Sequence, residues 1–328
     1  MGRKVRKVLN IRRFVKGVDA PAWVGVLNAA YKEYGSWWRG ITIDEMREQE
    51  KRPNFDFGGR FIANLDGKPV GVVHAALNCS FLFMKSTKEK KGFINTFCVI
   101  PKFRGRGVEE ELLEAAMNEL RKRGVNLIQT WTDIKREDRI QLLEKQGFVF
   151  AYRTIDMEIN LADIPSDIGE NTNVAIRSLQ KDVEEDIEML NWLINECFKE
   201  DPLRRPRTVE ETRHSVLNHP RLKEQEIFFA ALDQKNVGYL GIGIDEKYNL
   251  TQRVKSGRIN GIGVLKAYRR KGIGTRLMLQ GLKALRAKGM TKVMLDTEDI
   301  NPTRAVTLYE KVGFEVLQEY VTYEKHIA

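Results

Sequence analysis

The chain repeats itself at half its own length, and this duplication constrains its fold more than any other feature. The segment VIPKFRGRGVEEELLEAAMNELRKRG of the first half aligns without a gap with VLKAYRRKGIGTRLMLQGLKALRAKG of the second. Gly107 and Gly272 hold equivalent places in this alignment, as do Gly124 and Gly289. A repeat this long indicates a duplicated domain rather than a solenoid of short units. We therefore expect domains over 1–165 and 166–328, joined by a turn-rich linker.

Each copy predicts the same order of elements. In the second copy, the apolar periodicities predict a strand, two helices, three strands, and then helix, strand, helix and strand. We expect the last two helices over 272–288 and 302–311, and the last strand over 314–325. Such an order is typical of an α/β protein with a mixed sheet and helices on both faces.

Composition excludes several classes of protein. Of the net charge of +10, most lies in the first half, but the basic residues alternate with acids and have no aromatic-rich motif, which argues against a nucleic-acid partner. Three widely spaced cysteines form no Cys-x-x-Cys pair, and no His-Glu-x-x-His occurs, so we expect no metal. There is no apolar run of ~18 residues and no secretory signal. We expect a soluble, cytoplasmic protein without a membrane partner.

The second copy carries a loop suited to holding phosphate. A predicted strand ending at Val264 runs into Arg-x-x-Gly-x-Gly and then directly into a helix. Glycines let backbone N–H groups approach an anion, and the helix N-terminus adds partial positive charge. The loop comprises Arg269, Arg270, Lys271, Gly272, Ile273, Gly274 and Thr275. It lacks Gly-Lys-Ser/Thr and follows the fourth strand rather than the first, which argues against triphosphatase and dinucleotide folds. The pattern predicts a site for a pyrophosphate or a 3′-phosphate, to which Arg269, Arg270 and Lys271 supply counter-charge.

Around these residues the chain resembles the GNAT superfamily of acyl-CoA-dependent N-acyltransferases. The likeness rests on this loop with its helix and on the segment NPTRAVTLYEKVGF at 301–314. The duplicated layout is similar to that of tandem members such as mycothiol synthase. The resemblance implies two tandem GNAT folds, with acetyl-CoA bound where the fourth and fifth strands splay apart. Its pyrophosphate would lie on the amides of 270–275, and its pantetheine arm would pair with the backbone of Ile262, Gly263 and Val264.

The resemblance also implies a proton donor. Transfer of an acyl group from a thioester to an amine needs a neutral amine, a stabilised oxyanion and a proton for the leaving thiolate. Tyr309 matches the family's tyrosine that protonates the thiolate, although a tyrosine here could also serve only to pack its ring. Asn301 matches an asparagine that helps to hold the pantetheine region, and it also reads as a helix N-cap.

The general base is left open by the sequence. Many members of the superfamily use a glutamate on the fourth strand, but this chain has Arg258 and Asn260 there. Asp296 and Glu298, at the end of the fifth strand, are candidates for deprotonating an ammonium through water. The alternatives are that both are solvated or capping charges, or that the amine arrives deprotonated.

The first copy departs from the pattern at the functional positions. Glu109 stands where the second copy has Gly274, Leu143 stands where it has Tyr309, and IKRED at 134–138 replaces NPTRA. A carboxylate beside the loop would repel a pyrophosphate, and a leucine cannot donate a proton. We therefore expect residues 1–165 to form a degenerate, non-catalytic domain and residues 166–328 to form the catalytic domain that binds acetyl-CoA.

The sequence thus predicts an enzyme that moves an acetyl group from acetyl-CoA, its cosubstrate, to a primary amine by direct attack in a ternary complex. The acceptor is expected to be a small molecule or a peptide, and neither its identity nor the oligomeric state follows from the sequence. One alternative is an aminoacyl-tRNA-dependent transferase, which the basic first half suits but the intact loop does not. The other is a catalytically silent module that senses CoA or binds nucleic acid.

Overall fold

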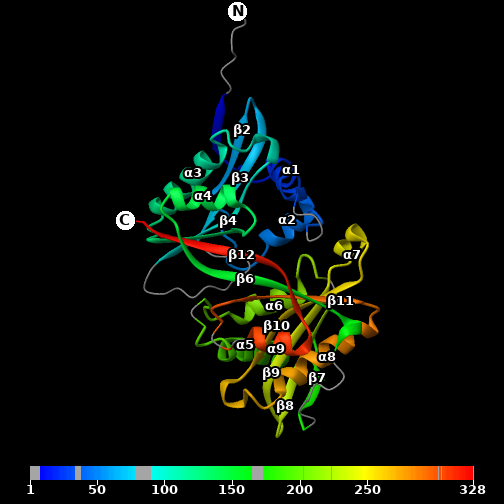
Figure 1. Ribbon diagram of the computed structural model, residues 1–328. Helices are drawn as coiled ribbons and strands as arrows, with labels where there is room; N and C mark the ends of the chain where they lie inside the picture. The colour runs from blue at the N-terminus through cyan, green and yellow to red at the C-terminus, as the bar shows by residue number, and fades with distance from the viewer. Residues whose placement is uncertain are drawn as a thin grey trace, which may run out of the picture. The chain divides into compact units, whose positions relative to one another are not determined.

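The computed structural model of the chain describes residues 8–33, 38–77, 90–164, 173–201, 203–222, 224–301, 303 and 305–327. The chain divides into two compact units, coloured mainly blue to green and green to orange in Figure 1. The first unit comprises the described residues up to Ala151 together with those from Thr322 onward. The second unit comprises the described residues from Tyr152 to Val321.

These units do not coincide with the expected ranges 1–165 and 166–328, because each copy gives its last strand to the other unit. Strand β6 (Val149–Asn160) belongs almost wholly to the second unit, where its residues 154–160 pair with β11 (Lys292–Glu298). The end of β12 (Glu315–His326) belongs to the first unit, where it lies next to β5 (Leu127–Asp133) in the strand order. The second unit therefore contains a strand that comes from the first copy.

The first unit is a mixed sheet with helices on both faces. Its strand order is β1-β2-β3-β4-β5, followed by the end of β12, and β4 and β5 are parallel. Adjacent residues of β3 face opposite sides: Val72 packs in the cluster of α1 and α2, whereas Gly71 lies against Leu112 of α3. Its elements are β1 (Leu9–Arg13), α1 (Ala20–Tyr31), α2 (Ile43–Glu50), β2 (Arg60–Leu65), β3 (Lys68–Ala76), β4 (Lys91–Val99), α3 (Val108–Lys122), β5 and α4 (Glu137–Lys145).

The second unit has the same architecture and confirms the mixed α/β fold predicted from the sequence. Its strand order is β6-β11-β10-β9-β8-β7, with β10 and β11 parallel and the other registered pairs antiparallel. Its further elements are β7 (Ala175–Ser178), α5 (Glu184–Cys197), α6 (Val209–Leu217), β8 (Glu224–Leu232), β9 (Lys235–Ile244), α7 (Glu246–Gln252), β10 (Ser256–Val264), α8 (Ile273–Ala287) and α9 (Ala305–Val312).

One detail differs from the sequence prediction. The short helix α7 was not expected; it begins where the side chain of Asp245 accepts a hydrogen bond of 2.9 Å from the backbone N–H of Tyr248, a local N-cap before only seven residues. Helix α9 is described from Ala305 to Val312, and residues 302 and 304 lie outside the described ranges.

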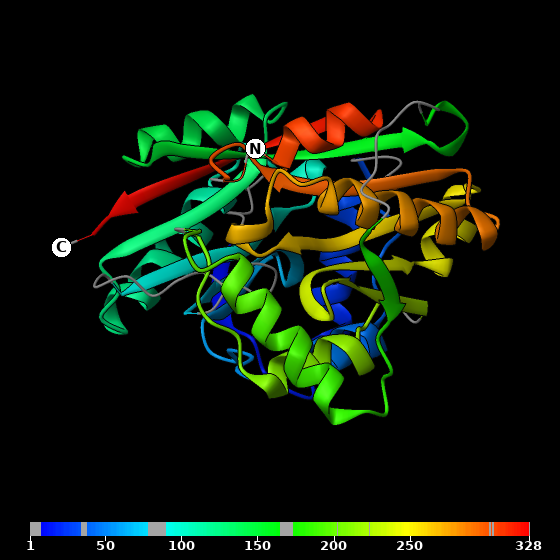
Figure 2. The same cartoon turned by 90° about the horizontal axis from the view of Figure 1, so that it is seen from below.

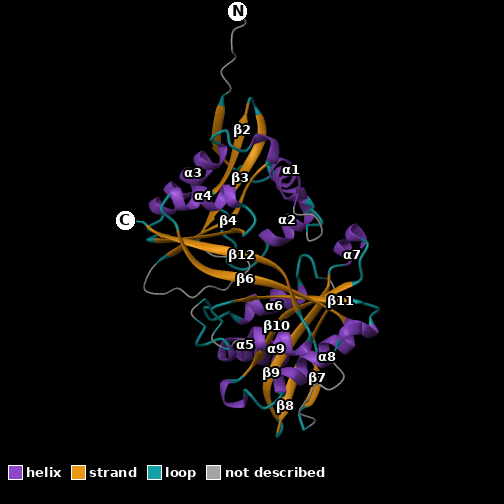
Figure 3. Cartoon of the chain, in the orientation of Figure 1, coloured by secondary structure: helices purple, strands orange, loops and turns teal. Residues whose placement is uncertain are grey.

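Helices cover both faces of the second unit's sheet. Figure 2 shows α5 and α8 on opposite sides of the strands, and Figure 3 shows the strands of this unit between helices. Alternate side chains of β8 and β9 account for this: Phe228 and Leu240 pack in the cluster that contains α8, whereas Phe229 and Tyr239 pack in the cluster that contains α5.

Candidate functional site

In the second unit, β10 and β11 separate partway along their length. They pair only from Ser256 opposite Lys292 to Arg258 opposite Met294. Beyond that point β10 continues to Val264 along β9, whereas β11 continues to Glu298 along β6. The separation leaves one edge of the later half of β10 without a neighbouring strand, so the splay implied by the resemblance is present. An extended ligand could pair with that edge as an added strand.

The glycine loop lies between the end of β10 and the start of α8. Gly272 has a φ of 76°, and Arg270 a φ of 62°, so the backbone turns through left-handed conformations immediately before the helix. The first N–H groups of a helix lack intrahelical partners, and here they belong to the predicted phosphate-binding residues from Ile273 to Thr275. This is the geometry of a helix N-terminal anion site.

Gly274 is closely packed on one side. A Cβ atom at this position would lie 3.2 Å from Cδ2 of Leu308 on α9 and 3.9 Å from Cγ2 of Val264. The first turn of α8 therefore packs against α9, which places the loop next to the helix that carries Tyr309.

Arg269 holds the loop together. Its Nε donates to the carbonyl oxygen of Val264 at 3.0 Å, and its Nη2 donates to the carbonyl oxygen of Cys197 at 2.7 Å. The first copy repeats the first of these bonds, from Nε of Arg104 to the carbonyl oxygen of Val99 at 3.1 Å. A contact present in both copies indicates a role in shaping the loop. Arg270 and Lys271 are exposed on the same loop and are placed to balance the charge of an anion.

The predicted pantetheine-binding segment is fixed by β9 on its other edge. Ile262 pairs with Leu240, and Val264 pairs with Gly238. A Cβ atom at Gly263 would lie 2.8 Å from the ring of Tyr239 and 2.9 Å from Cβ of Cys197, so only glycine fits at this position. The strand is therefore held rigidly beside the splay.

Tyr309 is buried beside the carboxylates of β11. Only 6% of the residue is exposed, and its ring lies edge-on to Phe314 with the centroids 6.1 Å apart. Burial raises the pKa of the phenol, and the charges of Asp296 and Glu298 raise it further. The hydroxyl has no hydrogen-bond partner among the residues that the structure describes. Both effects favour the neutral form of the phenol.

The two carboxylates of β11 have different surroundings. Glu298 is 3% exposed and accepts from Nη2 of Arg204 at 3.3 Å; burial raises its pKa, and the charge of Arg204 opposes that effect. Asp296 has a side chain that is 43% exposed and is paired with Arg258. Nothing in the sequence pointed to the contact from Arg204 to Glu298, because no local pattern connects positions so far apart in the chain.

Asn301 shapes the turn between β11 and α9. Its Oδ1 accepts from the backbone N–H of Thr303 at 2.9 Å and from the Thr303 hydroxyl at 2.7 Å, while its own N–H donates to the carbonyl oxygen of Glu298 at 3.1 Å. The described part of α9 begins at Ala305, and these bonds hold the turn that leads into it.

Another carboxylate was also missed. Asp156 of β6 lies directly opposite Asp296 in the antiparallel register. Burial raises its pKa to about 6; the charge of Arg258 opposes this effect, and that of Asp296 adds to it. No sequence pattern pointed to Asp156, because it belongs to the last strand of the copy that lacks the motifs.

In the first unit, the side chain of Arg139 lies in the equivalent splay. The strands β4 and β5 pair only as far as Ile94 opposite Thr130. Arg139, only 8% exposed, donates to the backbone carbonyl of Phe97, and its guanidinium lies 3.9 Å from the centroid of the Phe97 ring. Phe97 is the equivalent of Ile262 in the second copy. Arg139 therefore occupies the backbone group with which a pantetheine arm would have to pair.

The glycine loop of the first unit carries the expected carboxylate. Glu109 lies in the first turn of α3, and burial raises the pKa of its side chain. One of its oxygens, Oε2, is buried without a hydrogen-bond partner within the described part of the chain. Leu143, in the place of Tyr309, is fully buried.

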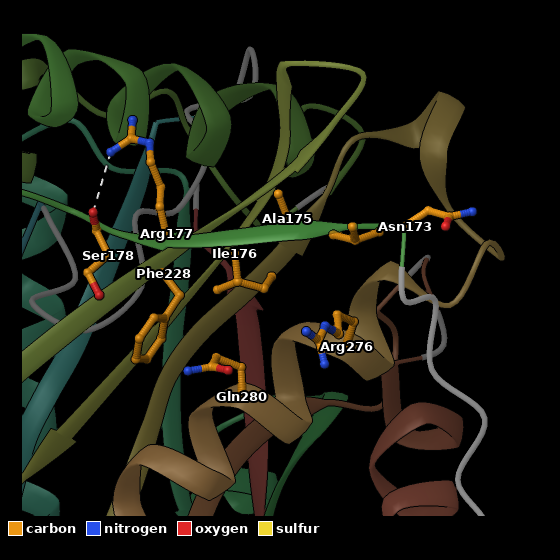
Figure 4. Close-up of a pocket in the computed structure, with 9 residues that line it drawn as sticks. Asn173, Ala175, Ile176, Arg177, Ser178, Phe228, Arg276 and Gln280 are labelled. Carbon is orange, nitrogen blue, oxygen red and sulfur yellow. Dashed lines mark hydrogen bonds between the residues drawn. The ribbon is translucent and has the colours of Figure 1, made fainter.

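A cavity of about 430 Å³ lies elsewhere in the second unit, between β7 and α8. Figure 4 shows Ile176 and Phe228 directed from the strands toward Gln280 on α8. None of its lining residues belongs to the splay.

Over the described ranges, no cluster of three His, Cys, Asp or Glu side chains could hold a metal ion, and no helix is long and apolar enough to cross a membrane.

A mixed sheet whose two parallel strands part beside a glycine loop and a helix N-terminus is the fold of N-acyltransferases that use acyl-CoA, and this chain contains it twice. The sequence model of the acetyltransferase (GNAT) family matches residues 23–148 and 187–314. The chain belongs to this family.

Similar proteins agree with the family and with the tandem layout. A mycothiol acetyltransferase of Thermomonospora curvata is 27% identical over 143 residues, 43% of this chain and 44% of the relative. One of Renibacterium salmoninarum is 27% identical over 232 residues, 66% of this chain and 62% of the relative. An N-alpha-acetyltransferase of Sulfurisphaera tokodaii is 35% identical over 112 residues, 32% of this chain and 66% of the relative. The chain thus aligns with less than half the length of the first of these relatives.

Solved structures resemble the whole chain in fold. A GCN5-related N-acetyltransferase from Sphaerobacter thermophilus aligns with a TM-score of 0.71 and 19% identity, covering 97% of this chain and 95% of that one. A tandem GNAT protein from the clavulanic acid biosynthesis pathway aligns with a TM-score of 0.71 and 13% identity, covering 97% and 98%. At this identity the likeness establishes the tandem fold.

Proposed function

We propose that the protein is an N-acetyltransferase that moves an acetyl group from acetyl-CoA to a primary amine, by direct attack within a ternary complex, at one site in the second unit. The observation that carries the proposal is the early end of pairing between β10 and β11, with the glycine loop at one end of the open edge and Tyr309 beside it. These features combine a place for the cosubstrate with a proton donor.

The second unit fits the cosubstrate. The helix N-terminus and the left-handed turn at Gly272 offer N–H groups to a pyrophosphate, and Arg270 and Lys271 add positive charge. The open edge of β10 offers backbone groups to the amides of a pantetheine arm. Asn301 keeps the turn after β11 in a fixed shape, and Arg269 does the same for the loop.

Tyr309 supplies the proton that the leaving thiolate needs. An ordinary phenol is already protonated at neutral pH, and it can protonate a thiolate when the two are close. Burial and the charges of Asp296 and Glu298 raise the pKa of Tyr309 and favour its neutral form, so that the phenol takes back a proton after transfer.

The first unit is proposed to be non-catalytic. Arg139 satisfies the carbonyl of Phe97 that a pantetheine arm would use, Glu109 places a carboxylate in the anion site, and Leu143 offers no proton. Three independent obstacles make recovery of activity by one substitution implausible on physical grounds, since each alone opposes binding or chemistry.

The test is a thiol-release assay with acetyl-CoA and a panel of primary amines: small alkyl amines, amino sugars, and peptides with free N-termini. We expect amine-dependent release of CoA by the wild type and acetylated product by mass spectrometry. Calorimetry should give one CoA site per chain. Absence of CoA binding would overturn the proposal and favour an aminoacyl-tRNA-dependent transferase, while tight CoA binding without turnover on any amine would favour a CoA-sensing module.

A further inference from the structure

Asp156 reaches the candidate site from the first copy of the repeat. Its strand β6 pairs with β11 over seven residues, from Lys292 opposite Asn160 to Glu298 opposite Thr154. Asp156 stands opposite Asp296, two residues beyond the point at which β11 parts from β10. Residues paired across two strands present their side chains on the same face, so the two carboxylates lie side by side at the mouth of the splay.

Arg258 connects the two carboxylates but pairs with only one. Its guanidinium forms an ion pair with Asp296, and its charge also acts on Asp156. Asp156 itself has neither an ion pair nor a hydrogen bond within the described ranges, although it is half-buried. A carboxylate that is partly removed from water and left unpaired is energetically costly, which is typical of a functional site rather than of a structural contact.

The other two carboxylates of the site are already engaged. Glu298 is buried against Arg204, and Asp296 is held by Arg258. Taking up a proton would cost either of them its ion pair. Asp156 can take up a proton without breaking any such contact, and its pKa of about 6 is closer to neutrality than that of an ordinary aspartate.

We propose that Asp156 is the general base of the reaction, receiving the proton of the acceptor's ammonium, and that Arg258 is its positioning residue. This inference rests on the proposed acetyltransferase function. It assigns the base to a strand of the first copy, so the catalytic site of the second unit is complete only with a residue from the other half of the sequence.

The protons and bonds balance with this assignment. The ammonium gives one proton to the Asp156 carboxylate, directly or through one water, and the neutral nitrogen forms a bond to the acetyl carbon. The carbon–sulfur bond breaks, the thiolate takes the proton of Tyr309, and the new amide nitrogen loses its remaining surplus proton to solvent. Asp156 then releases its proton to solvent, and solvent restores that of Tyr309.

The groups that influence the titration of Asp156 come from several elements. Arg258 on β10 and Asp296 on β11 act on it directly. Tyr320 on β12 and Tyr248 on α7 act on Arg258, and on its own strand Glu158 is paired with Lys292 at 2.6 Å. Arg258 favours the charged form of Asp156, whereas burial and Asp296 favour the neutral form.

The matched experiment compares Asp156→Asn with Glu158→Gln. Both replace a carboxylate of β6 by the amide of the same size, but Glu158 lies farther from the open edge, in its pair with Lys292. With an amine that the wild type acetylates, we expect Asp156→Asn to lower kcat by about 10²-fold, within the usual range for a general base, and to leave CoA affinity unchanged. Glu158→Gln should retain kcat within about twofold. The neighbouring substitution Asp156→Glu should recover part of the lost activity.

The pH profile separates a base from a structural residue. Wild-type kcat/KM, which reports the groups of the free enzyme, should fall on the acid side with an apparent pKa near 6 that is the same for two acceptors of different basicity, and this limb should vanish in Asp156→Asn. A limb that moves with the acceptor, or one that persists in the variant, would overturn the assignment. If the wild type acetylates no amine, the proposed function fails; if it is active and Asp156→Asn is equally active, only this inference fails.

Discussion

Gly274→Glu should abolish tight CoA binding without unfolding the protein. The substitution gives the second copy the glutamate that the first copy has at the equivalent position, Glu109. Folding should be little affected: the new Cβ would meet only the end of the flexible Leu308 side chain, at 3.2 Å, and an acidic residue in the first turn of a helix is favourable by about 0.3–1 kcal/mol. We expect the free energy of unfolding to change by less than about 1 kcal/mol.

The loss of affinity follows from the charge. A carboxylate about 6 Å from one phosphate charge, at an effective dielectric constant of about 20, is repelled by roughly 2–3 kcal/mol. This corresponds to a roughly 30–150-fold weaker Kd for CoA. The helix N-terminus cannot offset this penalty, because the added carboxylate competes for the N–H groups that would bind the phosphate.

Calorimetry with CoA provides the measurement, and Gly274→Gln provides the control. Glutamine has the size of glutamate without its charge. The ratio of the two Kd values therefore separates charge repulsion between the carboxylate and the phosphate from the steric effect of any side chain at this position. The ratio should shrink as salt rises from about 0.05 to 0.5 M, because screening shortens the range of the interaction. Equal affinities of the Glu and Gln variants at low salt, or wild-type affinity in the Glu variant, would refute the placement of the pyrophosphate at this loop.

Three further outcomes are expected. Tyr309→Phe should lower the rate of the chemical step by about 10²-fold with little change in the Michaelis constant for acetyl-CoA, measured by single-turnover kinetics; a normal rate would leave the tyrosine a packing role. Gly263→Ala should lower the free energy of unfolding by about 1–3 kcal/mol in thermal denaturation, because its Cβ would lie 2.8 Å from the ring of Tyr239. Gly261→Ala, whose Cβ would lie 3.5 Å from the nearest atom, should lower it by less than about 1 kcal/mol. Equal effects of the two substitutions would contradict the packing argument. Asp156→Asn should stabilise the protein above pH 6 and not near pH 4. The folded protein raises the pKa of this carboxyl from about 3.8 to about 6, so its contribution to stability is fully present below about pH 3.8 and is lost as the pH rises through about 6. Denaturation at both pH values measures the effect, and a stability gain at pH 4 alone would contradict the sign of this argument.

Local patterns were enough to predict most of the second unit. The predicted strand at 258–264 and helix at 272–288 match β10 (Ser256–Val264) and α8 (Ile273–Ala287) closely. Both depend on short-range signals, namely apolar periodicity and glycines at a strand–loop–helix junction. The departures in the first copy follow from the repeat alignment, because comparing two copies within one chain marks where one of them differs. The loop residues follow from the glycine pattern before a helix, and Tyr309 follows from the resemblance to the family.

The tertiary structure decided what those residues touch. The sequence predicts Arg269 as part of the phosphate-binding loop, and the structure shows its guanidinium bound to two backbone carbonyls. Arg139 was not singled out at all, yet it occupies the backbone edge of the first unit's splay. Neither placement leaves a local signal, because a guanidinium carries the same charge whether it meets a ligand or a carbonyl oxygen of its own chain.

The sequence by itself determined that there are two copies of one unit and that the second copy carries the intact motifs. It did not determine which sheet receives each copy's last strand. The alternation of apolar and polar residues along a strand specifies which of its faces is buried, but not which sheet edge the strand joins. The sheets of the two copies offer equivalent edges. Only the tertiary structure places β6 beside β11, and with it brings Asp156 of the first copy opposite Asp296 of the second.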